Sequence, residues 1–348
     1  MMTMTKDTLI LGIETSCDET AAAVVRNGRE TLSNIIASQV DVHKVFGGVV
    51  PEIASRQHLT AINNVVEAAL TEAGVSTQKI DAIAVTKGPG LVGAILIGLA
   101  TAKAMAFAFK KPLIGVHHIR GHICAALLEH PGLKPPFLAL VVSGGHTLLV
   151  DVRGVSGKEG DLAVLGGTRD DAAGEAWDKV ARVIGLGYPG GPKLDVLAKE
   201  GDPTKVAFKR VMLEEGSLDF SFSGVKTSVL NYVNNKRQAG ATVCEADVAA
   251  GFQEAVIDVL SAKTRAALKL TGRRALALAG GVAANSALRA RMRADAEQDG
   301  VRLYIPSPLL CTDNAAMIAC AGHYQYIEGL TDGLDLDAFA TLPLEFNN

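Results

Sequence analysis

The chain has 348 residues, which is too long for one typical hydrophobic core, so we expect two domains of roughly 150 residues each. Hydrophobic residues make up 48% and charged residues 20% of the chain, which is ordinary for a globular protein. The net charge of -3 excludes a general electrostatic attraction to nucleic acid, so any RNA contact needs a local basic patch or a partner protein.

The cysteines and the N-terminus indicate a cytoplasmic protein. The five cysteines include no CxxC pair, and an odd number of thiols is typical of a reducing compartment. The N-terminal residues enter a strand pattern at once and show no long apolar stretch before a cleavage site. We therefore expect no signal peptide and no action at a membrane.

The first predicted elements are two apolar strands joined by a short polar turn, in residues 8–25 (TLILGIETSCDETAAAVV). Polar turns at strand ends are where α/β sheets bind ligands. Glu14 and Asp18 lie in this turn, and we expect both side chains to face a cleft.

Residues 80–116 follow the order strand, glycine-rich turn, long helix, strand. The helical part, residues 91–109 (LVGAILIGLATAKAMAFAF), is long and apolar enough to raise the question of a membrane span. Lys103 lies near its middle and a Gly-Pro-Gly turn precedes it. We predict instead a buried helix of an α/β domain.

Three histidines lie close together in residues 116–127 (VHHIRGHICAAL) of a chain that has eight. His118 and His122 are four residues apart, a spacing that stacks two side chains on one face of a helix, where they could share a metal ion. Two hydrogen-bonded or exposed histidines would show the same spacing. The pair therefore needs a third ligand.

Two sequence patterns occur twice. Residues 137–152 (FLALVVSGGHTLLVDV) repeat the plan of strand, turn and strand, and residues 274–306 repeat the plan of strand, glycine turn, helix and strand. Any α/β chain contains some such units. The same order in both halves nevertheless favours a duplication, with two similar lobes lining one cleft.

The predicted lobes divide the chain unevenly. We expect a first lobe of residues 1–133 and 308–348, and a second lobe of residues 134–307. The charged, helix-rich residues of about 160–260 are predicted to be an insertion in the second lobe that forms one wall of the cleft. They lead into a clearly amphipathic helix pattern at residues 245–270.

A third candidate metal ligand lies far along the chain, before an apolar helix (CTDNAAMIA, residues 311–319). Asp313 would also be expected there as a helix N-cap. Two histidines and one carboxylate leave coordination positions open, and this set suits Fe2+ and also Zn2+. A zinc protease is the obvious alternative, but its motif requires a glutamate after the first histidine, and Ile119 takes that place.

Nine motifs, in order along nearly the whole chain, resemble those of the TsaD family, the catalytic subunits of bacterial tRNA threonylcarbamoyladenosine synthesis. They are GIETSCDETAAAVV, GGVVPEIASRQH, TKGPGLVGAILIG, VHHIRGH, VSGGHT, DDAAGEAWDKVARVIGLGYPGGP, FSFSGVKT, AGGVAANSALR and CTDNAAMIA. The resemblance implies an α/β fold of two duplicated ribonuclease-H-like lobes, of the actin, Hsp70 and sugar-kinase (ASKHA) type, with the active-site cleft between them.

The resemblance also implies a reaction. The exocyclic amine of the adenosine next to the anticodon, in tRNAs that read codons beginning with A, attacks the carbamoyl carbon of threonylcarbamoyl-AMP. AMP leaves, and the threonylcarbamoyl group stays on the base. Such a metal-dependent acyltransferase would hold one divalent cation per chain, Fe2+ as the first expectation and Zn2+ as the alternative.

Roles for single residues follow from the matched motifs. His118, His122 and Asp313 would be metal ligands. The substrate-binding positions would be Val141, Val142, Ser143, Gly144, Gly145, Asp178, Gly191, Asp195 and Asn285. Glycines let backbone N–H groups approach phosphate or carbonyl oxygens, and aspartates accept hydrogen bonds from ribose hydroxyls. The plain alternative is that the glycines make turns and the aspartates pair with lysines or water. We further hypothesise that Glu14 or Asp18 assists proton removal.

Partners and competing functions complete the expectation. The family works with TsaB-like and TsaE-like subunits, and the apolar stretches 61–70 and 91–109 are candidate docking surfaces. The basic segments 263–274 and 289–293 are candidates for contact with tRNA, although such arginines more often cover a solvated helix. An ATPase or kinase of the same fold is the strongest rival function, and a non-catalytic scaffold is the other.

Overall fold

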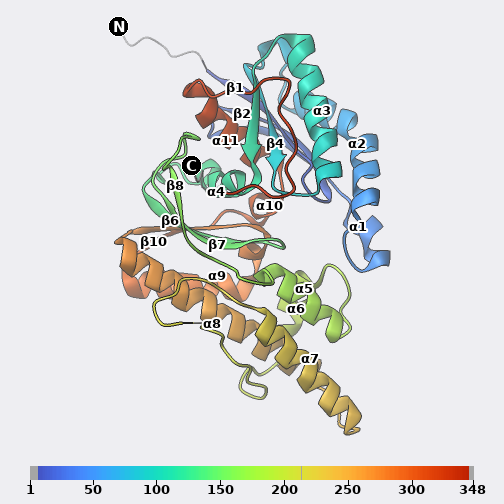
Figure 1. The fold of residues 1–348 in the computed structure, drawn as a ribbon, viewed down its shortest axis with the longest axis vertical. Helices are drawn as coiled ribbons and strands as arrows, with labels where there is room; N and C mark the ends of the chain where they lie inside the picture. The colour runs from blue at the N-terminus through green and yellow to red at the C-terminus, as the bar shows by residue number, and fades with distance from the viewer. Residues whose placement is uncertain (1–6, 213, 345–348) are drawn as a thin grey trace.

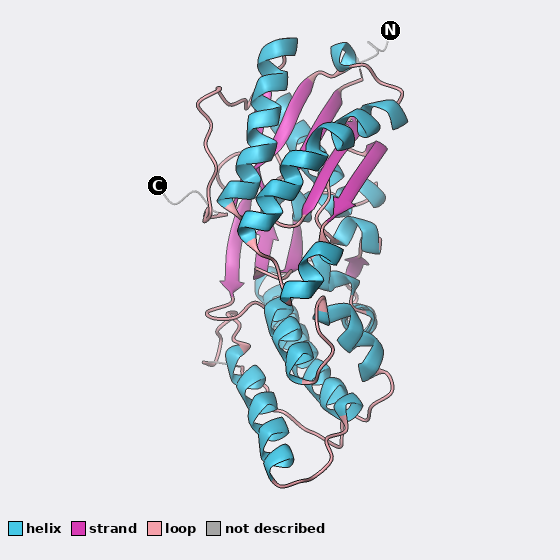
Figure 2. Ribbon diagram, turned by 90° about the vertical axis from the view of Figure 1, so that its right-hand side faces the viewer, coloured by secondary structure: helices cyan, strands magenta, loops and turns pink. Residues whose placement is uncertain are grey.

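The computed structural model describes residues 7–212 and 214–344, so that residues 1–6, 213 and 345–348 of the expected lobes lie outside the described residues. It contains two five-stranded sheets, one above the other along the long axis of the molecule (Figure 1). The long helices of the second half extend beyond the lower sheet, away from the first half (Figure 2).

The first sheet has the strand order β3-β2-β1-β4-β5. Its strands are β1 (Leu9–Glu14), β2 (Glu19–Arg26), β3 (Glu30–Ser38), β4 (Ala82–Gly88) and β5 (Leu113–His117). The first three strands pair antiparallel, as the predicted turn requires, whereas β4 and β5 add in parallel. Since β1, β4 and β5 are parallel, their carboxyl ends meet at one edge of the sheet.

The second sheet has the order β10-β9-β6-β7-β8. Read from β8 to β10, this order matches that of the first sheet strand by strand, with β6 in the place of β1. Its strands are β6 (Phe137–Val142), β7 (Thr147–Val152), β8 (Leu162–Gly167), β9 (Ala275–Ala279) and β10 (Arg302–Tyr304). Strands β6 to β8 pair antiparallel, and β9 and β10 are parallel to β6. The predicted duplication is therefore confirmed at the level of strand order and direction.

Two helices cover the outer face of the first sheet, α2 (Pro51–Glu72) and α3 (Val92–Phe109), and α1 (Val40–His43) precedes them. Helix α3 packs against α2 and β4. It is the one helix in the described part of the chain that is long and apolar enough to cross a membrane, yet only 33% of it is buried. The helix itself was predicted, but its full burial was not correct, because side chains such as Leu96 and Phe107 are exposed.

A pair of helices lies between the two sheets. Helix α4 (His118–Glu129) follows β5, and α11 (Ala315–Ile327) follows the short α10 (Pro308–Cys311) near the end of the chain. Helix α11 packs against α4 and against β1 and β4, while α4 also contacts β9 of the second sheet. Both helices belong to one buried cluster that includes strand residues of both sheets.

The second sheet has a larger helical layer than the first. It comprises α5 (Ala173–Val183), α6 (Gly190–Ala198), α7 (Ser223–Gln238), α8 (Glu245–Thr271) and α9 (Ser286–Asp299). Helices α5 to α8 all lie between β8 and β9, where the first half has α1 and α2, and they share one core with the sheet. The exact lobe and insertion boundaries stay a prediction.

Candidate metal centre and ligand cavity

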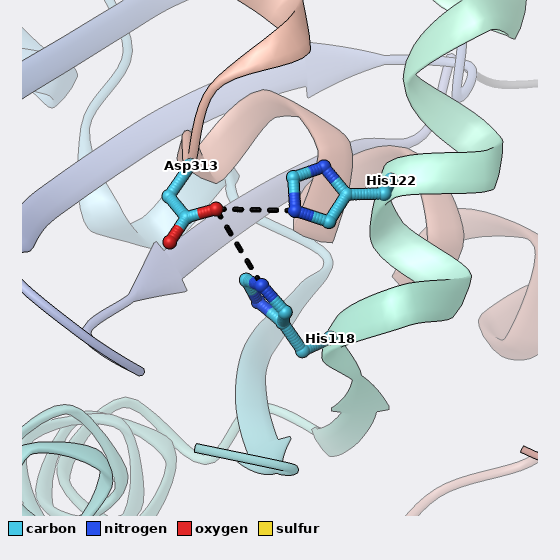
Figure 3. A group of neighbouring side chains, drawn as sticks. All are labelled: His118, His122 and Asp313. Carbon is cyan, nitrogen blue, oxygen red and sulfur yellow. Dashed lines mark ion pairs between the residues drawn. The ribbon is translucent and has the colours of Figure 1, made fainter. Parts of the chain in front are cut away.

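Three predicted ligands lie together between the two sheets. His118 and His122 project from one side of α4, and Asp313 meets them from the loop before α11 (Figure 3). The Oδ1 atom of Asp313 is 3.1 Å from Nε2 of His122 and 3.5 Å from Nε2 of His118. The three ligand atoms lie within 4.8 Å of one another, so that one cation could contact all three.

Local structure explains why a residue almost 200 positions away completes the group. Asp313 was expected to be a possible N-cap, but Asn314 caps α11 instead, accepting a hydrogen bond from the N–H of Met317 at 3.0 Å. The carboxylate of Asp313 is thus left for other contacts. Helix α11 can approach β1 because Gly12 has no side chain: a Cβ there would lie 2.3 Å from the carbonyl oxygen of Ala315.

The donor set fits a divalent metal. Nδ1 of His122 is buried without a hydrogen-bond partner among the described residues, and its Nε2 contacts only the carboxylate of Asp313, at 3.1 Å. A buried polar atom without a partner is costly unless something else binds it. Burial alone would raise the pKa of Asp313, but the neighbouring charge of His118 outweighs it and holds that pKa far below its usual value. An ionised carboxylate and two imidazoles are ligands that Fe2+ and Zn2+ accept.

Two further histidines lie near this group without joining it. His117 caps α4, since its Nδ1 accepts the N–H of Ile119, and its Nε2 is 3.1 Å from the carbonyl oxygen of Leu342. His146 is a residue that our sequence reasoning did not single out. Burial and then the charges of His118 and His122 lower the pKa of His146 to about 4, which places this second-lobe imidazole near the first-lobe group.

The prediction that Glu14 faces a cleft is wrong. Its side chain is completely buried at the end of β1, where the carboxylate is 3.0 Å from Nδ1 of His118. The carboxylate also accepts hydrogen bonds from the backbone of Ser16 and the hydroxyl of Thr86. A group enclosed in this way has no path to a substrate amine.

Asp18 has a different position from Glu14. Its Oδ2 accepts a hydrogen bond of 3.3 Å from the hydroxyl of Tyr188, which belongs to the second half of the chain. The side chain is 6% exposed, so its access to the space between the halves is small. Glu19 lies beside it, and burial together with the charges of Asp313 and Asp18 raises the pKa of Glu19 to about 10.

A cavity of about 400 Å³ lies in the second half, and several predicted substrate positions line it. These lining residues are Gly144, Asp178, Gly191, Asp195 and Asn285. The cavity is bounded by the turn after β6, by α5 and α6, and by the loop before α9. The structure therefore brings together residues that are up to 141 positions apart, from 144 to 285.

The turn after β6 presents open backbone groups. The N–H groups of Gly144 and Gly145 have no hydrogen bond within the described chain, and a Cβ at either position would meet nothing within 4 Å. Ser143 differs from the expectation, because its N–H is already bonded to the carbonyl oxygen of His146 at 2.8 Å. The side chains of Val141 and Val142 are buried in the core, so only their backbone could contact a ligand.

Two of the predicted substrate-binding side chains, Asp178 and Asp195, already accept hydrogen bonds from the protein. Asp178 uses Oδ1 to accept the N–H groups of Gly190 and Gly191, at 2.8 and 3.1 Å, and burial raises its pKa. Asp195 accepts both the N–H and the hydroxyl of Ser286. Oδ2 of Asp178 has no hydrogen bond within the described chain and is the oxygen left for a ligand.

Asn285 has two partners in the protein. Its Oδ1 caps α9 by accepting the N–H of Leu288 at 2.8 Å. Its Nδ2 donates to Oε1 of Gln253, a buried residue of α8, at 2.7 Å. One amide hydrogen therefore remains for a ligand in the cavity.

Sequence reasoning missed several residues of this cavity, and two of them are informative. Trp177 lines it, is the single tryptophan of the chain, and has a buried indole N–H without a partner among the described residues. Gly174 also lines it, and a Cβ there would lie 2.5 Å from the carbonyl oxygen of Ser143. A glycine is needed because α5 begins in direct contact with the turn.

Comparison with known proteins agrees with the site geometry. A family model described as TsaD, tRNA N6-adenosine threonylcarbamoyltransferase, matches residues 30–320. The tRNA N6-adenosine threonylcarbamoyltransferase of Clostridium beijerinckii is 56% identical over 336 residues, covering 97% of this chain and 98% of its own. That of Clostridioides difficile is 54% identical over 338 residues, covering 97% and 99%.

Solved structures of low sequence identity share the fold. HypF of T. kodakarensis superposes with a TM-score of 0.60 at 16% identity, over 95% of this chain and 49% of its own. Component A of the (R)-2-hydroxyglutaryl-CoA dehydratase of Acidaminococcus fermentans has a TM-score of 0.53 at 15% identity, over 92% and 98%. The expected α/β fold of two similar lobes is confirmed.

Proposed function

This chain belongs to the TsaD family of tRNA N6-adenosine threonylcarbamoyltransferases, and we propose that it works with one divalent cation held by His118, His122 and Asp313. The reaction of the chain is the transfer of a threonylcarbamoyl group to N6 of an adenosine in tRNA. The single observation that supports the metal is the convergence of two imidazoles and a carboxylate whose ligand atoms lie within 4.8 Å of one another. The chain would bind Fe2+ first, with Zn2+ as the alternative.

The three metal ligands and the residues around the cavity would have different roles in the reaction. A divalent cation in this position would supply Lewis-acid polarisation of an oxygen of the donor. The free N–H groups of Gly144 and Gly145 are suited to bind an oxyanion or phosphate oxygen, because backbone dipoles fixed in advance stabilise developing charge. His146 lies in the same turn, and burial together with the charges of His118 and His122 lowers its pKa.

We assign the cavity of about 400 Å³ to the nucleotide half of threonylcarbamoyl-AMP. Its lining combines a buried indole, the side-chain-poor start of α6 (Pro189, Gly191 and Pro192) and the carboxylate of Asp178, which suits a flat base and a ribose with hydroxyls to donate. In the reaction the N6 amine forms a bond to the carbamoyl carbon and the bond from that carbon to the phosphate oxygen breaks. AMP leaves, and the amine loses one proton.

Asp18 is better placed than Glu14 to accept the proton that the amine loses. It touches the cavity loop through Tyr188, whereas Glu14 is enclosed behind His118. Replacing Asp18 with asparagine should slow transfer from the preformed donor without loss of bound metal. An unchanged rate in this variant would remove Asp18 from the reaction.

A reconstitution experiment tests the proposed function. Metal-stripped protein is supplied with threonylcarbamoyl-AMP and unmodified tRNA, with no metal, with Fe2+ under anaerobic conditions, or with Zn2+. We expect one AMP per modified adenosine when metal is present and neither product when a chelator is added. Equal rates in the stripped protein would refute the metal. ADP formed from ATP alone, without tRNA modification, would favour the rival kinase or ATPase.

Donor binding can be measured separately from turnover. Trp177 lines the cavity and is the single tryptophan, so its fluorescence reports on that cavity alone. We expect AMP and the donor to change this signal at saturating concentration. A donor that binds with no change in signal, seen by equilibrium dialysis, would place the nucleotide elsewhere.

Several basic side chains of the two candidate tRNA segments are already paired within the protein. In residues 263–274, Lys263 is buried against backbone carbonyls, Arg265 pairs with Asp299 and Arg273 pairs with Asp151. Arg291, in residues 289–293, pairs with Asp258. These four cations are engaged within the protein, whereas Lys269, Arg274 and Arg293 are exposed. We propose that these three side chains and a partner's surface together provide the affinity for tRNA.

The α2–α3 face is our candidate for docking a TsaB-like subunit. A groove of about 940 Å³ runs between these helices and is lined by residues such as Val66, Leu70, Met105 and Phe109. A TsaE-like subunit is proposed as the further partner, and a cytoplasmic location follows from the tRNA substrate. The five cysteines are all free, which agrees with a reducing compartment.

A further inference from the structure

A buried carboxylate lies behind one of the metal ligands. Glu14 is 0% exposed, and its two oxygens are surrounded by donors: the N–H of Ser16 at 2.5 Å, the hydroxyl of Thr86 at 2.5 Å, and Nδ1 of His118 at 3.0 Å. Burying an ionised carboxylate costs several kcal/mol unless it is paired and fully hydrogen-bonded. Here the hydrogen bonds meet that condition.

The fold places these groups together through its parallel strands. Glu14 is the last residue of β1, Thr86 lies near the end of β4, and His118 begins α4 directly after β5. The carboxyl ends of these three strands share one edge of the first sheet. The carboxylate is therefore held by groups from the end of β4, from the turn after β1 and from the first residue of α4.

We propose that Glu14 is a positioning residue that orients His118 for the metal. A carboxylate can only accept a hydrogen bond here, so when the imidazole is neutral, as a metal ligand must be, its proton is on Nδ1 and the lone pair is on Nε2. Nε2 is the atom that faces Oδ1 of Asp313, at 3.5 Å. The inference rests on the proposed metal centre, since it gives Glu14 no role apart from that ligand.

His122 provides the internal contrast. It comes from the same face of the same helix, one turn later, but its Nδ1 has no partner among the described residues. The ring centroids of the two imidazoles are 4.7 Å apart and the rings are nearly perpendicular, at 82°. His118 is thus the ligand with a built-in orientation, and Glu14 acts on this ligand and not on its neighbour.

The variant Glu14→Gln tests the proposal through metal affinity. Glutamine keeps the shape of the side chain but places an amide N–H2 among groups that all donate. We expect the affinity for Co2+ or Zn2+, measured by competition with a chelator, to fall about tenfold to a hundredfold. The absorption bands of bound Co2+ should also change, because the orientation of one ligand changes.

A matched control separates positioning from general damage. Asp295→Asn also neutralises a buried carboxylate, one that accepts the hydroxyl of Ser261 in the second half of the chain. It should leave metal affinity and the Co2+ spectrum as in the wild type. A comparable loss in Asp295→Asn would mean that any buried charge change weakens the site, and would overturn the inference.

A double-mutant cycle with His118→Ala, titrated at metal concentrations high enough to fill the weakened site, gives the decisive result. If Glu14 acts through His118, then Glu14→Gln should have no further effect on metal affinity once the imidazole is gone. Additive losses, or a Glu14→Gln variant with wild-type affinity, would overturn the proposal. A wild-type protein that binds no metal would instead refute the metal centre itself. Should Glu14→Gln fail to fold, Thr86→Val removes one donor to the same oxygen, and an unchanged affinity there would count equally against us.

Discussion

The duplication gives the chain two hairpin turns at equivalent places, and they have opposite surroundings. The turn between β1 and β2, residues 15–18, is buried, with Thr15 and Ser16 only 1% and 2% exposed. The turn between β6 and β7, residues 143–146, is open, with exposed glycines whose N–H groups have no partner in the described chain. One scaffold thus serves two purposes.

The difference lies in the side chains and not in the backbone plan. In the first turn, side chains fill the space, and Ser16 joins Glu14 in contacting Nδ1 of His118. In the second turn, Gly144 and Gly145 leave space that a ligand can fill. We conclude that the first turn supports the metal ligands and the second receives the donor.

The largest predicted effect is on the transfer rate when a metal ligand is removed. Asp313→Ala should lower the transfer rate about a hundredfold or more, because Lewis-acid stabilisation is worth several kcal/mol and each 1.36 kcal/mol is tenfold. AMP binding, followed by the fluorescence of Trp177, should stay near normal. Loss of AMP binding together with the rate would show that the two turns do not work separately.

The next largest effect is on kcat/KM when the open turn that receives the donor is displaced. Gly174→Ala would place a Cβ 2.5 Å from the carbonyl oxygen of Ser143 and 2.9 Å from Cα of Gly144, so the open turn must move. We expect kcat/KM to fall about tenfold to a hundredfold, as for small displacements of catalytic groups, with metal content unchanged. Gly132→Ala, where a Cβ meets nothing within 4 Å, is the control and should behave as the wild type.

A pH experiment sharpens the contrast, since acidic side chains lie at the first turn. The pKa of Glu19 is raised to about 10, so this group stays protonated in the folded protein while it ionises in the unfolded chain above about pH 4.3. Stability from Glu19 is therefore full below that pH and is lost as the pH rises toward 10. Metal-free Glu19→Gln should be more stable than wild type at pH 8, by at least about 1 kcal/mol, and equal at pH 4. Urea denaturation curves that differ equally at both pH values would contradict this.

The smallest predicted effect concerns the link between the two sides. Tyr188→Phe removes the 3.3 Å hydrogen bond from the cavity loop to Asp18. Such a bond contributes about 0.5–1.5 kcal/mol, so we expect kcat/KM to fall about two- to tenfold with metal content unchanged. A larger loss, accompanied by loss of metal, would show that the loop helps to hold the metal centre.

Local patterns carried much of the prediction. Both strand–turn–strand units, the long helix after Gly90, and the i, i+4 pair of histidines follow from periodicity and turn residues, and the structure contains them all. The convergence of Asp313 on His118 and His122 was also expected, though it rested on the family resemblance and not on spacing.

The predictions were wrong where burial or capping depends on contacts with residues that a local sequence pattern does not show. The burial of Glu14 depends on Thr86 and on the first residue of α4, which no local pattern connects to the first turn. The capping of α11 by Asn314 depended on a choice between two adjacent residues that both make good caps. The exposure of one face of α3 reflects what packs against it, which composition alone does not encode.

The most direct test of the central claim is the metal content of four proteins, prepared in parallel: wild type, His118→Ala, His122→Ala and Asp313→Ala. Each is loaded with Fe2+ or Zn2+, passed through a desalting column and analysed by mass spectrometry of the metal. We predict about one metal per wild-type chain, as expected for a single site, and nearly none in each variant. A variant that keeps about one metal per chain would contradict the assignment of that residue, and a wild type without metal would contradict the whole account.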